Sequence, residues 1–119
     1  MIKVVILSGD DTEAVSSLCV DTSLTVLNKS TFISAVKLDI LNIGKLSNML
    51  ADIFIITGGE PYKIRGLLGG VGSKAIRQFV SNGGKYIGVC AGVVLATANR
   101  PTLDLLQRVQ CVNDNIWRD

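Results

Sequence analysis

The sequence predicts an α/β fold with an open, mostly parallel sheet and helices on both faces. Short apolar runs at residues 2–7, 52–57 and 85–89 alternate with segments of helical spacing, and small or glycine residues follow each run. Continuous apolar runs of this length are typical of strands buried on both faces of a parallel sheet. Ligands bind such sheets at the carboxyl ends of the strands.

Length and composition set the first limits. The 119 residues predict one domain over residues 1–119. No run approaches the ~18 uninterrupted apolar residues of a membrane span, and Lys3 interrupts any signal-peptide pattern, so we expect a cytoplasmic protein with no membrane partner. A net charge of +2 is too small to indicate a nucleic-acid partner.

The cysteine and histidine content limits the chemistry. The three cysteines have no CxxC spacing, which argues against a disulfide framework and a structural zinc site, so we expect reduced thiols and no metal. Nothing in the sequence predicts a cofactor. The chain has no histidine, the side chain that most often acts as a general base.

Residues 2–7 predict the first strand, which ends at Ser8 and Gly9. Asp10 and Glu13 have the spacing of a capping box and predict the start of a helix. One apolar face of that helix would contain Ala14, Val15, Leu18 and Cys19. We therefore expect Cys19 in the core, because free cysteines are among the most buried residues.

The middle of the chain contains an outer strand and a central one. Residues 24–27 and 36–40 both have strand character, and we expect one of them to be an outer strand. A helical spacing follows, weakened by Gly44, at Ile43, Leu46, Met49 and Leu50. The most hydrophobic strand, residues 52–57, ends at Gly58 and Gly59, which allow a tight turn with outward N–H groups.

Residues 60–72 are rich in glycine and predict a loop, after which Ser73 would cap a helix that ends at residues 82–84. Ser73 precedes Lys74, whereas a phosphate-binding P-loop has lysine before the hydroxyl residue, so the sequence argues against nucleotide binding. Four basic residues could line an anion site or form a solvated face: Lys63, Arg65, Lys74 and Arg77.

The chemistry is expected at residues 85–92, where an apolar strand enters the turn Gly88-Val89-Cys90-Ala91-Gly92. Small residues on both sides are what a strained strand-to-helix turn requires around a nucleophile. The turn would expose the Cys90 sulfur at a helix N-terminus, which favours a thiolate. We hypothesise that the N–H groups of Gly59 and Ala91 form an oxyanion hole beside it.

The C-terminal part is less informative. Residues 99–101 break the chain at Pro101, and residues 103–112 fit a helix or a strand, with a helix favoured. Trp117 is expected to anchor packing or an interface.

Three segments, residues 55–62, 68–72 and 76–92, resemble the N-terminal amidotransferase-like domain of eukaryotic-type biotin–protein ligases, within the class I glutamine amidotransferase-like domains. The resemblance implies a flavodoxin-like three-layer sandwich, with Cys90 at the position of the nucleophile and Gly59 and Ala91 at those of the oxyanion donors. The matching motifs also make Gly58, Glu60, Tyr62, Gly88 and Gly92 candidate binding residues.

The departures from that family matter as much. Its amidotransferases complete the site with a histidine and an acid from a later segment, which this chain lacks, so a truncated domain is one interpretation and glutamine hydrolysis by the chain alone is not expected. Biotinylation does not carry over either, because the ligase's catalytic domain is a separate module that nothing here matches.

Three functions remain open. The domain could be non-catalytic or regulatory and present Cys90 to a small ligand or a protein partner. It could instead be a cysteine-dependent hydrolase, or a redox or aldehyde-handling enzyme, that takes a base from a partner. The third alternative is an inert cysteine on inherited architecture, with Glu60 merely solvated. The sequence does not specify the ligand or the oligomeric state.

Overall fold

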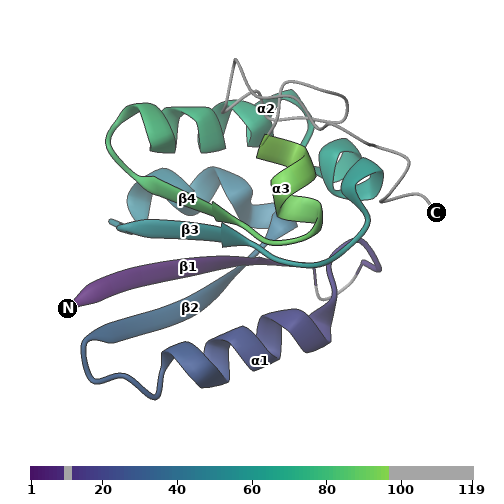
Figure 1. Ribbon diagram of the computed structural model, residues 1–119. Coiled ribbons are helices and arrows are strands. Elements are labelled where there is room, and N and C mark those ends of the chain that lie inside the picture. Colours follow the sequence, from purple (N-terminus) through teal and green to yellow (C-terminus); the bar gives the residue numbers. More distant parts are fainter. Residues whose placement is uncertain (10–11, 97–119) are drawn as a thin grey trace.

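The computed structural model describes residues 1–9 and 12–96. Its centre is a four-stranded, all-parallel sheet in the order β2-β1-β3-β4 (Figure 1). The strands are β1 (Ile2–Ser8), β2 (Ile33–Asp39), β3 (Ile53–Ile56) and β4 (Lys85–Gly88). The predicted α/β class with a parallel sheet is confirmed.

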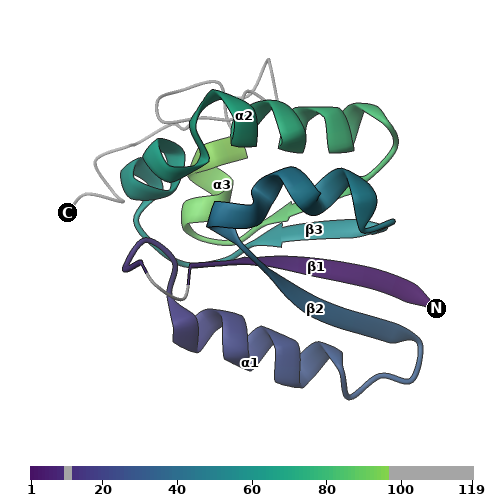
Figure 2. The ribbon, with the colours of Figure 1, turned by 180° about the vertical axis from the view of Figure 1, so that it is seen from behind.

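Helices cover both faces of this sheet. Helix α1 (Ser17–Leu27) lies on one face, whereas the 3-10 helix η1 (Ile40–Asn48) and helix α2 (Pro61–Ser81) lie together on the other (Figures 1 and 2). Helix α3 (Ala91–Ala96) follows β4. This arrangement is the three-layer sandwich of flavodoxin-like folds.

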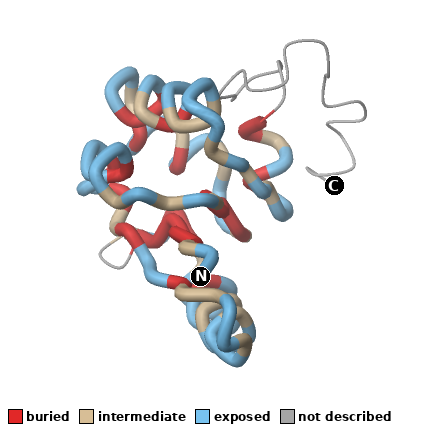
Figure 3. Tube along the Cα trace, turned by 90° about the vertical axis from the view of Figure 1, so that its left-hand side faces the viewer, coloured by how far each residue is buried: buried red, intermediate tan, exposed pale blue. Residues whose placement is uncertain are grey.

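The core lies where the sheet meets its helices, and the buried residues gather there in Figure 3. Phe54 of β3 is fully buried and contacts Phe79 of α2 edge-on, with ring centroids 6.2 Å apart. The ring of Tyr86 in β4 lies 6.4 Å from that of Phe54. These contacts identify the face of the sheet that α2 covers.

The start of α1 differs from the sequence prediction. The helix begins at Ser17, and Ser16 is its N-cap, with the Ser16 side-chain oxygen accepting a hydrogen bond from the Cys19 N–H at 3.3 Å. Ala14 and Val15 are buried, as expected, but they lie in an extended segment before the helix. The helix buries Val20 against the sheet and leaves Cys19 exposed, so the prediction of a core Cys19 is wrong.

The prediction of a glycine-rich loop at residues 60–72 is also wrong. Helix α2 begins at Pro61, and Ser73 lies inside it instead of capping it. The helix is kinked at Gly69, which has φ 60° and ψ −164°. The glycines mark this kink, while the buried Ile64 and Leu68 hold the first half of the helix against the core. The predicted end of the helix, at Asn82, is confirmed.

The remaining segments follow the sequence more closely. Of the two candidate outer strands, residues 24–27 belong to α1, and residues 36–39 form part of β2. In η1, Ile43 and Leu46 are buried, whereas Leu50, which follows the helix, is exposed. No helix within residues 1–9 and 12–96 is long and apolar enough to cross a membrane. The predictions for residues 99–119, including Trp117, lie outside the described residues.

Candidate functional site

The candidate residues meet at the carboxyl edge of the sheet. Ile56 of β3 is in register with Gly88 of β4, and the Val89 N–H donates to the Ile56 carbonyl at 3.0 Å, so the pairing continues one residue past β4. The chain therefore leaves β3 at Gly58 and Gly59, next to the point where it leaves β4 at Cys90. The structure brings these predicted residues to the same edge.

Cys90 links β4 to α3 in an unusual backbone conformation. Its φ is 54°, in the left-handed region that residues with a β-carbon seldom adopt. Its thiol is free and exposed. The Cys90 carbonyl accepts a hydrogen bond from the Val93 N–H at 3.0 Å, which closes the first turn of α3.

Gly88 and Gly92 are required by close backbone contacts around this turn. A β-carbon at Gly88 would lie 2.5 Å from the carbonyl carbon and oxygen of Gly92. A β-carbon at Gly92 would collide with the carbonyl oxygen of Ile56 in the neighbouring strand. Both glycines thus allow α3 to start directly above the end of β3.

Tyr86 supports the same turn and was not predicted from the sequence. Its hydroxyl donates to the Gly92 carbonyl at 2.6 Å, which ties β4 to the start of α3. Burial of the ring raises the pKa of Tyr86 well above its usual range. The only available signal was its spacing, since an aromatic residue two positions before Gly88 faces the same side of the strand as that glycine.

Gly58 and Gly59 are held by residues 14–16, a segment that we call the strap. The Ser16 N–H donates to the Gly58 carbonyl at 3.0 Å, and the Glu60 N–H donates to the Ala14 carbonyl at 2.8 Å. A β-carbon at Gly59 would collide with that Ala14 carbonyl. The sequence pattern predicts a helix at Ala14 and Val15, so it does not reveal the strap.

The strap leaves the two predicted oxyanion donors available. Gly59 pairs with Val15 as an antiparallel bridge between these two hydrogen bonds, so its own N–H points away from the strap. Within residues 1–9 and 12–96, neither the Gly59 N–H nor the Ala91 N–H donates a hydrogen bond. Both groups can therefore donate to a bound molecule.

Glu60 and Tyr62 lie at the start of α2, next to this edge. Glu60 is the N-cap, but its side chain makes no capping hydrogen bond and is exposed. Tyr62 is exposed in the first turn. Among the basic residues of α2, Arg65 donates to the Gly69 carbonyl at 3.4 Å, while Lys63, Lys74 and Arg77 are exposed.

A second free thiol lies at the same edge. The Cys19 sulfur is 3.1 Å from the position that a β-carbon of Gly58 would occupy. No sequence pattern signals this contact, because it depends on where α1 begins. Within the described part of the chain, no cluster of three or more potential metal-binding side chains occurs.

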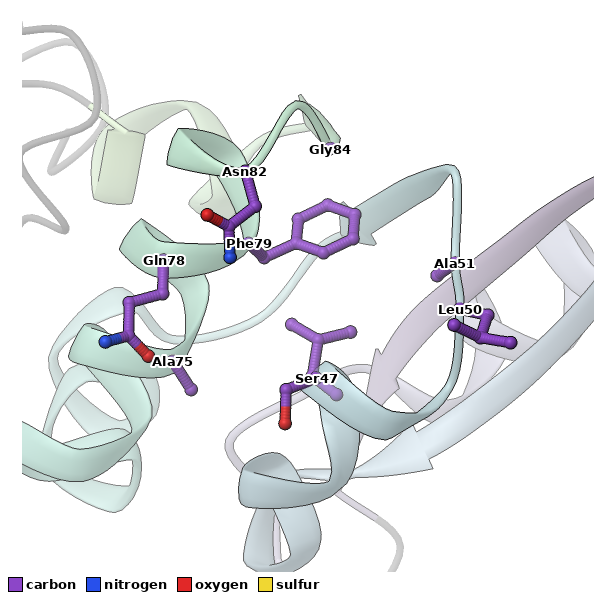
Figure 4. Close-up of a pocket in the computed structure, with 9 residues that line it drawn as sticks. Ser47, Leu50, Ala51, Ala75, Gln78, Phe79, Asn82 and Gly84 are labelled. Atoms are coloured by element: carbon purple, nitrogen blue, oxygen red, sulfur yellow. The ribbon is translucent and has the colours of Figure 1, made fainter.

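Two surface grooves lie at the opposite, amino edge. One, of about 170 Å³, lies between η1 and α2 (Figure 4) and is lined by Ser47, Leu50, Ala51, Ala75, Gln78, Phe79, Asn82 and others. A shallower one of about 460 Å³ borders Asp52 and Gly83. Neither contains any of the predicted site residues, and we retain the carboxyl edge as the candidate site because the strained cysteine and the available N–H groups are there.

The fold and this edge define a class: a parallel, flavodoxin-like α/β domain with a cysteine turn at the carboxyl end of its sheet. The sequence model of the family described as "Biotin-protein ligase, N terminal" matches residues 2–101. The chain belongs to this family, and the resemblance seen in the sequence is confirmed. A search of curated proteins finds no match to the chain.

Proposed function

We propose that this domain is a non-catalytic or regulatory amidotransferase-like domain that presents Cys90 to a small ligand or a protein partner. The observation that carries the proposal is the backbone of Cys90, which has φ 54° between Gly88 and Gly92. A left-handed conformation costs a residue with a β-carbon on the order of 1 to 3 kcal/mol and persists where the surroundings impose it. A turn of this kind is the geometry of a nucleophile elbow.

The surroundings of the thiol support binding at this turn. The sulfur is exposed, and the N–H groups of Gly59 and Ala91 can donate hydrogen bonds to a carbonyl or carboxylate oxygen of a ligand. Gly58, Glu60 and Tyr62 would border such a ligand on the side of β3 and α2. The proposal requires a reduced thiol, so it assumes a reducing compartment such as the cytoplasm.

The composition supports a non-catalytic role. Amide hydrolysis by a cysteine needs a base to accept the thiol proton and an acid to protonate the departing amine. The 119 residues contain no histidine, and loss of such a group typically lowers the rate ~10² to 10⁴-fold.

A second candidate is a cysteine-dependent hydrolase or redox enzyme that receives its base from a partner. The two available N–H groups favour it, because such donors stabilise the oxyanion of a tetrahedral intermediate. Both candidates predict no turnover by the isolated chain, and they differ only when a partner that supplies a base is present.

Ammonia release from glutamine tests whether the isolated chain is catalytic. We expect the purified chain to release no more ammonia than its Cys90→Ala variant, measured by a coupled assay with millimolar glutamine. Release that depends on Cys90 would contradict the proposal and move the domain to the enzyme class.

The relative alkylation rates of the two thiols test whether Cys90 is presented to small molecules. We expect iodoacetamide to modify Cys90 at least about ten times faster than Cys19 at neutral pH, because the Gly59 and Ala91 N–H groups beside Cys90 can hold the amide oxygen of the reagent. Both thiols are exposed, so exposure alone does not distinguish them. Peptide mapping of a time course gives the two rates, and equal rates would remove the basis for a specialised role.

A further inference from the structure

The topology predicts a ligand crevice beside the Cys90 turn, one strand away. The chain passes from β1 to β2 in one direction across the sheet and then returns past β1 to β3. In open parallel sheets, ligands bind outside the carboxyl ends of the two strands where this direction reverses. Here those strands are β1 and β3, which are paired with Val4 opposite Ile53.

Two buried hydroxyl groups lie at that position without hydrogen-bond partners. Ser8, the last residue of β1, is 1% exposed, and Thr57, which follows β3, is 4% exposed. Neither side-chain oxygen has a hydrogen-bond partner within residues 1–9 and 12–96. An unsatisfied buried polar group costs about 1 to 3 kcal/mol, so two of them side by side call for an explanation.

Both hydroxyls belong to the face of the sheet that α1 covers. Extending the register of β1 and β3 by two residues beyond Ile6 and Ile55 places Ser8 opposite Thr57, and residues opposite each other in a parallel pair share a face. Val5, opposite Phe54, belongs to the α2 face, because the Phe54 ring contacts Phe79. Ser8, three residues after Val5, is therefore on the opposite face, which is that of α1.

The N-terminus of α1 meets these hydroxyls. Ser16, its N-cap, is hydrogen-bonded to Gly58, the residue after Thr57. The N–H groups of Ser17 and Leu18 donate no hydrogen bond within the described residues, and the first turn contains no acidic side chain. The helix has 11 residues, long enough for its aligned peptide dipoles to place partial positive charge at this end.

We propose that the crevice between β1 and β3 binds the oxyanion of a small ligand, a carboxylate or a phosphate. The Ser8 and Thr57 hydroxyls would donate to its oxygens, and the N-terminus of α1 would balance its charge. Hydroxyl donors and helix N–H groups together suit an acceptor-only group, whereas a cation would face the positive end of the helix. The site involves no thiol chemistry and would exist whether or not Cys90 reacts.

The strap controls access to this site. Its two backbone hydrogen bonds, from Ser16 to Gly58 and from Glu60 to Ala14, join the segment that follows β1 to the segment that follows β3. Binding requires these bonds to open or shift. The exposed carboxylates of Glu13 and Glu60 flank the strap and oppose an anion, so Glu60→Gln should raise the affinity modestly.

Titration with simple anions tests the proposal. Inorganic phosphate and sodium acetate, each added at constant ionic strength against sodium chloride, are the probes, and the amide NMR signals of Ser17, Leu18 and Thr57 are the readout. At least one probe should give saturable shifts at these amides, and the better probe identifies the phosphate or the carboxylate class.

Four substitutions sharpen the test. Thr57→Val and Ser8→Ala should weaken binding of that probe at least tenfold while leaving the melting temperature equal or higher, because each removes an unsatisfied hydroxyl. Ser73→Ala is the matched control, since Ser73 is another buried hydroxyl without a partner but lies in α2, and it should keep full affinity. Cys90→Ala should also keep full affinity, which separates this site from the proposed function.

The opposite results would overturn the proposal. Shifts that stay linear with concentration in both titrations would mean no site. Equal affinities in Thr57→Val and Ser73→Ala would mean that the hydroxyls do not contact the anion. A lower melting temperature in both Thr57→Val and Ser8→Ala would mean that the hydroxyls already serve the fold.

Discussion

The glycines at the carboxyl edge and those in the first half of α2 have opposite surroundings. At Gly59, Gly88 and Gly92, an added β-carbon would collide with backbone atoms of another segment. At Gly66 and Gly70, nothing lies within 4 Å of that position. Close packing therefore requires glycine at the carboxyl edge, whereas Gly66 and Gly70 lie on an exposed surface of α2 where a side chain would fit.

This difference explains why a high density of glycines does not by itself predict a loop. The segment with the most glycines predicts a loop, yet it is a helix. Ile64 and Leu68 are buried at helical spacing, and their burial outweighs the loss of helix propensity, which is about 1 kcal/mol per glycine. The structurally demanding glycines are instead those where strands β3 and β4 end. What matters is the contact that a β-carbon would make.

The largest expected effect tests this contrast directly. Gly92→Ala should lower the free energy of unfolding by about 2 to 4 kcal/mol, because the new β-carbon forces α3 away from Ile56. Gly66→Ala is the matched control and should raise it by about 0.5 to 1 kcal/mol. Urea unfolding measures both, and effects of the same sign would contradict the comparison.

Tyr86 provides the next largest effect. Tyr86→Phe removes the hydrogen bond to Gly92 and should cost about 1 kcal/mol near neutral pH. The pKa of Tyr86 is raised in the native state, so above about pH 10 the unfolded state releases this proton while the native state holds it. The unfolded state then binds fewer protons, and stability falls as the pH rises.

The loss of stability at alkaline pH should therefore depend on the Tyr86 hydroxyl. Between about pH 10 and 11.5, the wild-type free energy of unfolding should fall more steeply than that of Tyr86→Phe, by up to about 1.4 kcal/mol per pH unit. Parallel slopes in the two proteins would show that the phenol is not protected at the turn.

The smallest effect concerns Cys90 itself. Cys90→Gly should raise the free energy of unfolding by about 1 kcal/mol, because glycine adopts φ 54° without the cost of a β-carbon. Cys90→Ala should change it by less than about 0.5 kcal/mol, since alanine keeps that cost. Equal stabilities of the two variants in chemical denaturation would argue that the turn relaxes without strain.

Sequence patterns predicted the strands and the cysteine turn because both are local. The apolar runs at residues 2–7 and 52–57 and the Gly88-Cys90-Gly92 spacing each fix their own structure within a few residues. The strap, the exposed Cys19 and the Tyr86 hydrogen bond depend on segments distant in sequence. Asp10 and Glu13 offered a capping box, but pairing of Ala14 and Ser16 with the β3 side delayed the helix to Ser17.

The strap also has a consequence for how the domain folds. It joins residues 15 and 59, which are 44 positions apart (59 − 15), through two backbone hydrogen bonds. Closing so long a loop lowers the entropy of the chain, and the free energy of two hydrogen bonds alone does not offset this loss. The pairing of β1 with β3 must bring the two segments together first, so we expect the strap to form after the folding transition state and to open without global unfolding. The carboxyl edge would then be the last part of the sheet to assemble and the first to exchange its amide hydrogens.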